Sequence, residues 1–281
     1  MSELWSNLSC GALGLKVEFD EAVELAAEFG FAAVEADLGY LAGLPQDQLA
    51  TAGKRLGERG LRWGPAGLPV DLTADAARFA SQLAELPGKV AILQAAGVDR
   101  TGTWIRPMHN ELTYRRNFAR YTERIALVDE ILRGGNLRFG LEYVGPKTFW
   151  STELYPFVHT LRETRELIAA TGSKNVGIVL DTYHWYTSAE TPDDLRSLRA
   201  DEVVAVDVND AHADRERDEQ MDLDRCLPGT TGTIDVAGFL GALRDIGYDG
   251  PVKVEPFSKE LKGLPAREVV EKTAASLKAV L

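Results

Sequence analysis

Short apolar runs alternate with longer amphipathic stretches along the chain. The short runs are rich in Val, Ile, Leu and Ala, which is typical of strands buried on both faces. The longer stretches repeat apolar residues at helical spacing, often begin near Asp, Thr or Pro, and often end at Gly. This alternation predicts repeated units of one strand followed by one helix.

Eight strands and eight helices are predicted. The predicted strands are Leu4–Cys10, Phe31–Asp37, Leu61–Leu68, Lys89–Ala96, Leu137–Val144, Val176–Asp181, Val203–Val208 and Pro251–Glu255. The predicted helices are Asp20–Phe29, Gln46–Arg59, Ala74–Leu86, Asn117–Arg133, Leu154–Ala170, Pro192–Leu198, Val236–Ile246 and Ala266–Val280. Such alternation favours an α/β fold with an all-parallel sheet, and eight repeats favour a closed (β/α)8 TIM barrel over a doubly wound open sheet. No Gly/Ser-rich linker divides the chain, so residues 1–281 are interpreted as one domain.

One predicted helix start carries clear capping chemistry. Thr191 is a suitable N-cap, Pro192 suits the first helical position, and the two aspartates that follow face the positive end of the helix dipole. His159 falls within a predicted helix. Two long loops are expected, at residues 97–116 and 214–224, and a loop as long as the first is often functional in a compact domain.

The composition narrows the class of partner. The chain carries 43 acidic and 31 basic residues, a formal net charge of -12, so a nucleic acid is an unfavourable partner and a small molecule or cation is expected. Two cysteines, Cys10 and Cys226, are too few for a disulfide framework. The first residues lack the features of an export signal, and no apolar run is long enough to span a bilayer. We therefore expect a cytoplasmic protein without a membrane partner, and homo-oligomerisation through the outer helices stays open.

Four successive predicted strands end in a carboxylate: Glu142, Asp181, Asp207 and Glu255. Active sites of β/α barrels lie at the C-terminal ends of the strands. A single carboxylate in such a position most often caps the next helix or faces solvent. Four of them at the ends of consecutive strands point to a shared site.

Strand alternation predicts that these four side chains share one face. If the preceding residues Leu141, Leu180, Val206 and Val254 point outward to the helices, the carboxylates point into the barrel. Several carboxylates in one low-dielectric site repel one another unless a cation compensates their charge. Because Mn²⁺ and Mg²⁺ prefer oxygen ligands, we predict that the four carboxylates bind one of these divalent metals.

Other polar and aromatic residues are candidates for binding a substrate. His184 lies just beyond the end of the sixth predicted strand, and Arg225, in the loop after the seventh, has the donors for a hydroxyl pair or a carboxylate. Trp104 and Trp185 offer apolar faces to sugar C–H groups, although plain packing is an equal alternative. His212 is a further candidate ligand.

Five stretches together resemble a known superfamily. They are Gly140–Glu142, Leu180–His184, Val206–Asp210, Arg225–Gly229 with Gly232–Asp235, and Gly247–Pro256. In these stretches the sequence resembles the xylose-isomerase-like superfamily of sugar phosphate isomerases and epimerases, which includes ketose 3-epimerases, inosose-handling enzymes and nucleases of the endonuclease IV type. The resemblance covers essentially the whole chain and is specific for the superfamily, though not for a substrate.

The resemblance implies roles for particular residues. It implies that Glu142, Asp181 and Glu255 bind a divalent metal, that His184 contacts substrate, and that Arg225 belongs to the substrate shell. It also implies that the two glutamates exchange the proton next to a substrate carbonyl. The family usually has a histidine where this chain has Asp207, and a carboxylate there still suits Mn²⁺ or Mg²⁺ while adding negative charge.

The predicted function is therefore that of an enzyme of carbohydrate metabolism. It is a divalent-metal-dependent isomerase or epimerase that acts on a sugar or polyol by removing a proton next to a carbonyl, through an enediolate. A dehydratase or lyase that uses the same site on a keto-sugar or inosose is one alternative, and a non-catalytic ligand-binding barrel is another. A metal-dependent endonuclease is disfavoured by the acidic balance and by the presence of four histidines in the whole chain.

Overall fold

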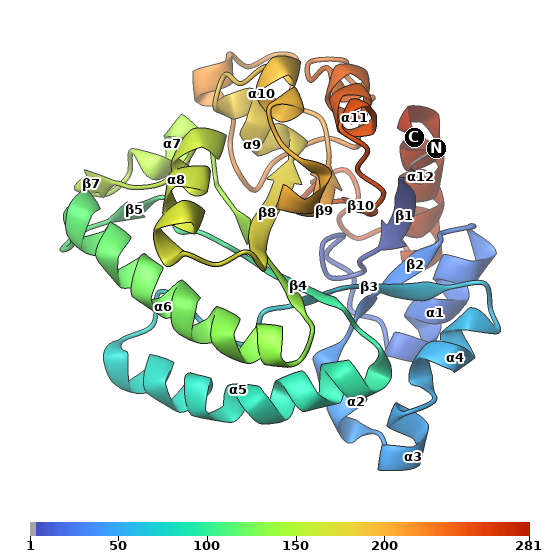
Figure 1. Ribbon diagram of the computed structural model, residues 1–281. Coiled ribbons are helices and arrows are strands. Elements are labelled where there is room, and N and C mark those ends of the chain that lie inside the picture. The colour runs from blue at the N-terminus through green and yellow to red at the C-terminus, as the bar shows by residue number, and fades with distance from the viewer. Residues whose placement is uncertain (1–3) are drawn as a thin grey trace.

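The computed structural model describes residues 4–281, which form a closed barrel of parallel strands (Figure 1). Neighbours in the barrel follow chain order, and β1 pairs with β10 to close it. The barrel strands are β1 (Trp5–Leu8), β2 (Ala33–Ala36), β3 (Arg62–Gly67), β4 (Arg100–Trp104), β6 (Arg138–Glu142), β8 (Val176–Asp181), β9 (Val203–Val208) and β10 (Pro251–Val254). The predicted (β/α)8 barrel is confirmed.

Helices surround the barrel as an outer layer (Figure 1). They are α1 (Phe19–Glu28), α2 (Leu38–Gly43), α3 (Gln46–Leu49), α4 (Ala52–Gly57), α5 (Ala76–Ala96), α6 (Tyr114–Gly134), α7 (Lys147–Trp150), α8 (Leu161–Thr171), α9 (Thr182–Thr187), α10 (Pro192–Arg196), α11 (Val236–Asp245) and α12 (Ala266–Val280). Two 3₁₀ turns, η1 (Ala200–Glu202) and η2 (Arg217–Glu219), complete the set. Within residues 4–281, no helix has both the length and the apolar composition needed to cross a membrane.

The fourth predicted strand was wrong. Residues 89–96 form the C-terminal part of α5, where Val90, Leu93 and Ala96 are buried at a spacing of three, as in a helix. Pro87 and the glycine after it lie inside this helix, which continues through them. The actual fourth strand is β4, which lies within residues 97–116, where the sequence predicts a long loop.

The helix predicted over residues 154–170 also begins later than expected. Its first residues instead form β7 (Tyr155–Pro156), which pairs antiparallel with β5 (Met108–His109). The helix α8 begins after Thr160, whose side chain accepts a hydrogen bond from the Glu163 N–H. His159 therefore lies in a loop and not within a helix. The predicted helix at 46–59 is divided into α3 and α4.

Local sequence explains the start of α10 and the packing of β6 against β8. The expected capping box at Thr191 is present, with Asp194 as its partner and Pro192 at the first helical position of α10. On β6, a Cβ at Gly140 would lie only 2.6 Å from Cγ2 of Val179. Glycine at this position therefore leaves room for the side chain of Val179 on the neighbouring strand β8.

Candidate metal and substrate site

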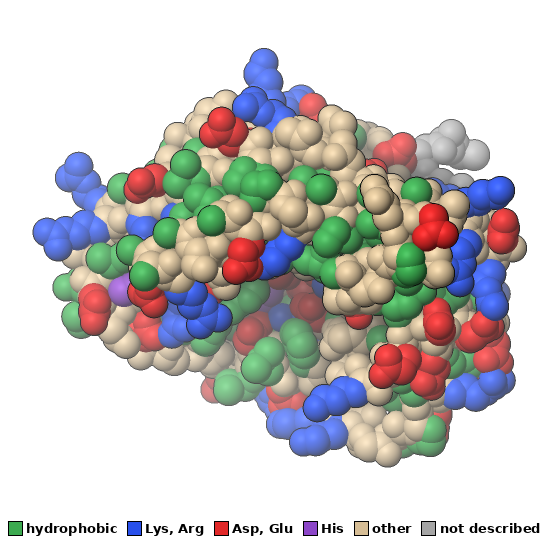
Figure 2. Space-filling view, turned by 90° about the horizontal axis from the view of Figure 1, so that it is seen from below, with side chains coloured by type: hydrophobic (Ala, Val, Ile, Leu, Met, Phe, Trp, Pro, Cys, Tyr) green, Lys and Arg blue, Asp and Glu red, His purple; other side chains and the backbone are tan. Residues whose placement is uncertain are grey.

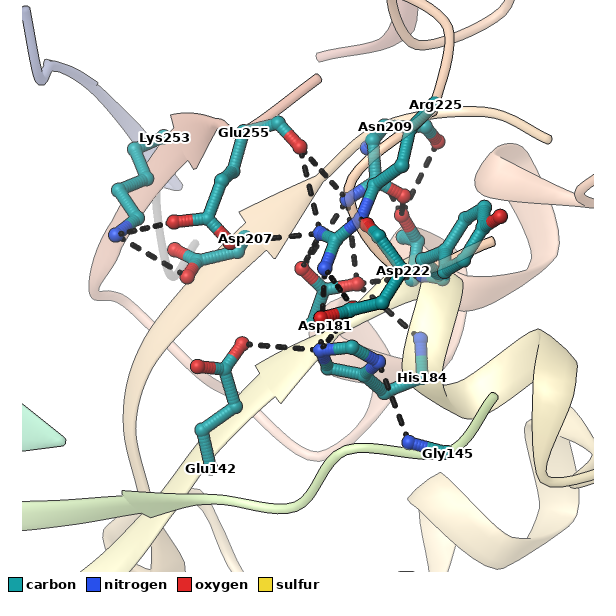
Figure 3. Close-up of polar contacts among 12 residues, drawn as sticks. Glu142, Gly145, Asp181, His184, Asp207, Asn209, Asp222, Arg225, Lys253 and Glu255 are labelled. Carbon is teal, nitrogen blue, oxygen red and sulfur yellow. Dashed lines mark hydrogen bonds and ion pairs between the residues drawn. The ribbon is translucent and has the colours of Figure 1, made fainter. Parts of the chain in front are cut away.

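Four carboxylates converge at the C-terminal ends of β6, β8, β9 and β10 (Figure 3). One oxygen from each of Glu142, Asp181, Asp207 and Glu255 lies within 4.8 Å of the corresponding atoms of the others. The preceding residues Leu141, Leu180, Val206 and Val254 are buried in the hydrophobic core, as alternation requires. The structure thus brings together the whole predicted carboxylate set.

Two of these carboxylates keep an oxygen without a partner. Oε1 of Glu142 and Oδ1 of Asp207 are buried and accept no hydrogen bond from any described residue. The pKa of Glu142 is raised well above its usual value, first by burial and then by the charges of Glu255 and Asp207. Burial and Glu255 also raise the pKa of Asp207, although Lys253 opposes the shift. Buried, unpartnered carboxylate oxygens at this spacing fit a hard divalent cation.

A buried guanidinium organises one side of the cluster. The side chain of Arg225 is 1% exposed and makes an ion pair at 2.9 Å with Asp181 and another at 2.8 Å with Asp222. It also lies 3.4 Å from Oε2 of Glu255. Its Cζ lies 4.8 Å from the ring centroid of Tyr183 and 4.9 Å from that of Phe257. With its donors used inside the protein, Arg225 holds two of the carboxylates in fixed positions.

Asp181 is held by several donors. Its Oδ1 accepts the backbone N–H groups of Tyr183 and His184, so it caps α9. The amide nitrogen of Asn209 contacts both carboxylate oxygens, at 3.2 and 3.1 Å. Since the Asp181 side chain is fully buried, these donors replace the water that it loses.

His184 lies against the same cluster in a neutral form. Its ring is 2% exposed, and burial together with the charge of Arg225 lowers its pKa to about 3. Nδ1 accepts a hydrogen bond from the Gly145 N–H at 3.3 Å, and Nε2 lies 3.3 Å from a guanidinium nitrogen of Arg225. Nε2 lies 3.7 Å from Oε1 of Glu142 and 3.9 Å from Oδ1 of Asp222.

Three polar residues of the site were missed by the sequence analysis. Asn209 and Asp222 hold Asp181 and Arg225, as described above, and Lys253 contacts the other side of the cluster. The acidic neighbours of Lys253 outweigh the effect of burial and raise its pKa well above the ordinary value. The available signal for Lys253 was its place two residues before Glu255, which puts both side chains on one face of a strand.

A cavity of about 310 Å³ opens beside the carboxylates. Its lining includes Glu142, Asp207, Lys253, Glu255 and Trp104. The face drawn in Figure 2 is hollowed near its centre, and acidic side chains lie in the hollow. A cavity of this size at the strand C-termini has room for a small polar molecule.

The two candidate tryptophans have different positions. Trp104 lines the cavity, is 44% exposed, and lies 6.4 Å from the ring of Phe149. Trp185 is buried in the outer layer, where it packs edge-on against Phe239 and donates its Nε1–H to the carbonyl of Thr191. This placement corrects the expectation that Trp185 faces a sugar. Trp185 instead packs within the protein, which is the alternative given in the sequence analysis.

His212, the further candidate ligand, is not part of the carboxylate cluster. Its Nε2 lies 3.3 Å from Oδ1 of Asp224, and its Nδ1 lies 3.7 Å from Sγ of Cys226. Arg215 and Lys259 also contact Asp224. The structure therefore places His212 in a separate polar group of the loop that follows β9.

Tyr143, directly after Glu142, forms a hydrogen bond with the titratable side chain of Glu190. Its hydroxyl donates a 2.5 Å hydrogen bond to Glu190, which also accepts the Leu161 N–H. Burial raises the pKa of Glu190 from 4.5 to about 7. Between these two values the folded protein keeps a proton that the unfolded chain releases, so the free energy of unfolding falls as the pH rises through this window.

We expect the Glu190→Gln variant to lose this pH dependence. At a pH above the window, the substitution should stabilise the protein by up to about 3 kcal/mol, because an amide needs no proton to be neutral. Melting temperatures of both proteins at pH 5 and pH 8 measure the effect. An equal fall in melting temperature for the variant and the wild type would contradict the assignment.

The fold and the site define a class of protein, a (β/α)8 barrel with an acidic site at the C-terminal ends of its strands. The chain belongs to the xylose isomerase-like TIM barrel family, which matches residues 23–280.

Two relatives are similar over part of the chain. The chain is 29% identical over 124 residues to an inosose isomerase of Bacillus velezensis, a stretch that covers 44% of this chain and 44% of the relative. It is 28% identical over 157 residues to a 3-dehydroshikimate dehydratase of Pseudomonas putida, which covers 51% of this chain and 23% of the relative. The match therefore spans less than half the length of each of these proteins.

Solved structures are similar over nearly the whole chain. A xylose isomerase domain protein of Alicyclobacillus acidocaldarius has a TM-score of 0.86 and 29% sequence identity, covering 99% of this chain and 97% of that one. The IolI protein, whose crystal structure contains a zinc atom, has a TM-score of 0.82 and 20% identity, covering 99% and 98%. The likeness to the IolI protein is one of fold.

Proposed function

We propose that this protein is a divalent-metal-dependent isomerase or epimerase that acts on a sugar or polyol by removing a proton next to a carbonyl. The observation that carries the proposal is the group of four carboxylates, of which two have a buried oxygen without a partner. The partial similarity to an inosose isomerase supports a cyclic or open-chain keto-polyol as the substrate. The partner is thus a small molecule.

The four carboxylates are the proposed metal ligands. Glu142, Asp181, Asp207 and Glu255 supply oxygen atoms only, which suits Mn²⁺ or Mg²⁺. Such an ion, when bound, polarises carbonyl and hydroxyl oxygens and so makes the adjacent C–H more acidic.

The proposed chemistry uses two of the carboxylates as base and acid. Glu142 and Glu255 come from separate strands, β6 and the end of β10, and both line the cavity. One removes the proton next to the carbonyl, and the other returns a proton from the opposite face, which inverts the carbon centre. Return of the proton to the neighbouring carbon gives an isomerisation instead.

The surrounding residues are proposed to orient the carboxylates and to contact the substrate. His184 is neutral and lies outside the cavity lining, with its Nε2 3.7 Å from Oε1 of Glu142, so its proposed role is to orient that carboxylate. Arg225 fixes Asp181 and Glu255, which makes it a positioning residue. The exposed ring of Trp104 covers the apolar C–H face of a polyol at the cavity rim.

A dehydratase is the second candidate function. The partial similarity to a 3-dehydroshikimate dehydratase favours it. The same proton abstraction yields a dehydration when the resulting carbanion expels a hydroxyl from the next carbon.

Because both cysteines are free, we also propose a cytoplasmic location.

The first test is metal analysis of the purified protein by mass spectrometry, after chelation and after addition of Mn²⁺. We expect about one metal ion per chain in the wild type and at least roughly tenfold weaker binding in Asp207→Ala, since a ligand is lost. The exposed Asp47→Ala is the matched control and should bind like the wild type. If the wild type takes up no metal under any loading condition, the proposal is wrong, and the non-catalytic ligand-binding barrel is the remaining alternative.

A further inference from the structure

Lys253 is the one basic residue among the described residues that line the cavity. The same lining contains four acids, Glu35, Glu142, Asp207 and Glu255. Arg225 and His184, which the sequence analysis selected for substrate binding, are not part of the lining. A molecule inside this cavity therefore meets its only full positive side-chain charge, among the described residues, at Lys253.

The position of Lys253 follows from strand geometry. It lies on β10, two residues before Glu255, so both side chains point to the same face. Nζ lies 3.3 Å from Oδ2 of Asp207 and 3.4 Å from Oε1 of Glu255. Figure 3 shows Lys253 on one side of the cluster, with Arg225 and His184 on the other. The two oxygens of Glu255 thus face two different cations.

Lys253 keeps capacity for a further partner, and Arg225 does not. An ammonium group has three N–H donors, and the described residues give Lys253 two ion-pair partners. Its side chain is 23% exposed toward the cavity, compared with 1% for Arg225. The guanidinium donates to Asp181 and to Asp222 and has no open face.

The ammonium group of Lys253 can stabilise the negative charge that develops on a substrate oxygen. Removal of a proton next to a carbonyl places negative charge on the carbonyl oxygen, and the four neighbouring carboxylates oppose that charge. A cation held in advance beside the reacting oxygen stabilises the developing charge without reorganisation. Lys253 is held in this way, because Asp207 and Glu255 fix its Nζ from two sides.

We propose that Lys253 is a further catalytic residue, whose ammonium group binds the substrate oxygen that becomes negative when the adjacent proton is removed. The inference rests on the proposed isomerase function and adds to it. The proton stays on Nζ, no bond to the lysine forms, and Asp207 serves as its positioning partner as well as a metal ligand.

The same charges define the class of substrate. One lysine faces four acids in the cavity lining, so a phosphate dianion would be repelled. An uncharged keto-polyol, which presents one carbonyl oxygen to Lys253 and hydroxyls to the carboxylates, is accommodated. The inferred substrate is therefore an unphosphorylated keto-sugar or inosose.

The test compares Lys253→Met and Lys253→Arg with Lys278→Met, an exposed lysine on α12, as the control. Two quantities are measured: the affinity for Mn²⁺ by titration, and the rate of C–H exchange with D₂O for 2-keto-myo-inositol, D-fructose and D-tagatose. Lys253→Gln replaces the methionine variant if the latter does not fold.

We expect Lys253→Met to lower kcat for exchange by about 10²-fold or more with little change in KM, since the contact forms with the developing charge. Lys253→Arg should restore part of the rate, because it keeps a cation. Mn²⁺ should bind Lys253→Met at least as tightly as it binds the wild type, because a neighbouring positive charge is gone. The control should match the wild type in both quantities.

Different outcomes separate the two proposals. Wild-type kcat in Lys253→Met, or a loss of Mn²⁺ affinity that parallels the loss of rate, would overturn the role of Lys253 alone. A wild type that binds no Mn²⁺, or that exchanges none of the three ketones with Mn²⁺ bound, would overturn the proposed function and this inference together. D-Fructose 6-phosphate is measured beside D-fructose, and faster exchange of the phosphate ester would overturn the assigned substrate class.

Discussion

Replacement of Glu142 by glutamine should slow proton exchange strongly while stabilising the metal-free protein. The loss of rate is expected to be about 10²–10⁴-fold, because an amide cannot act as a general base. The gain in stability is expected because the ionised carboxylate is buried beside three other acids and keeps one oxygen without a partner. Its pKa is raised in the folded protein, so ionisation of this carboxyl group at neutral pH opposes folding, and the amide removes that cost.

This prediction is checked by two measurements on one variant. Chemical unfolding of the metal-free proteins gives the change in stability, for which we expect a gain. Deuterium exchange with Mn²⁺ present gives the change in rate. Glu111→Gln, an exposed residue of the loop before α6, is the control and should change neither. An active Glu142→Gln protein would remove this residue from the mechanism.

Replacement of Arg225 by methionine should be the most destabilising of the substitutions considered. The guanidinium is 1% exposed and neutralises Asp181, which is fully buried, together with Asp222 and Glu255. Removal of one partner from such a buried pair leaves an uncompensated charge and costs about 3–5 kcal/mol. The stacking contacts with Tyr183 and Phe257 are weakened as well.

Urea unfolding of Arg225→Met beside Arg115→Met, an exposed residue of α6, measures this cost. The control should lie within about 0.5 kcal/mol of the wild type. Part of the loss in Arg225→Met should be recovered by adding Asp181→Asn, which removes the charge that was left unpaired. A single variant as stable as the wild type would mean that the network relaxes when the arginine is absent.

The barrel was predictable because its signals are local. Alternation of buried strands with amphipathic helices is visible in short windows, and eight units close a barrel. The error at the fourth strand has a local cause too. Pro87 and Gly88 resemble a helix end, and the real strand, Arg-Thr-Gly-Thr-Trp at residues 100–104, lacks the apolar run of its neighbours. Packing within the barrel, and not composition, makes those residues a strand.

The carboxylate set was predictable because period-two alternation and parallel strand ends place such residues on one face at one edge. The partners of these residues were harder to identify. Trp104 and Trp185 look alike in sequence, and only the structure shows that one lines the cavity and the other packs against Phe239. Asn209 and Asp222 give no pattern that separates them from ordinary loop residues.

The sequence by itself therefore determined the fold class, the strands that end in acids, and the inward direction of those acids, since each depends on residues close together in the chain. The tertiary structure alone decided which charges meet. Lys253 reaches Asp207 because β9 and β10 pair with these two residues directly opposite each other, and Arg225 reaches Asp181 across 44 residues of chain. Strand register and loop path set these contacts, and both join residues that lie far apart in the chain.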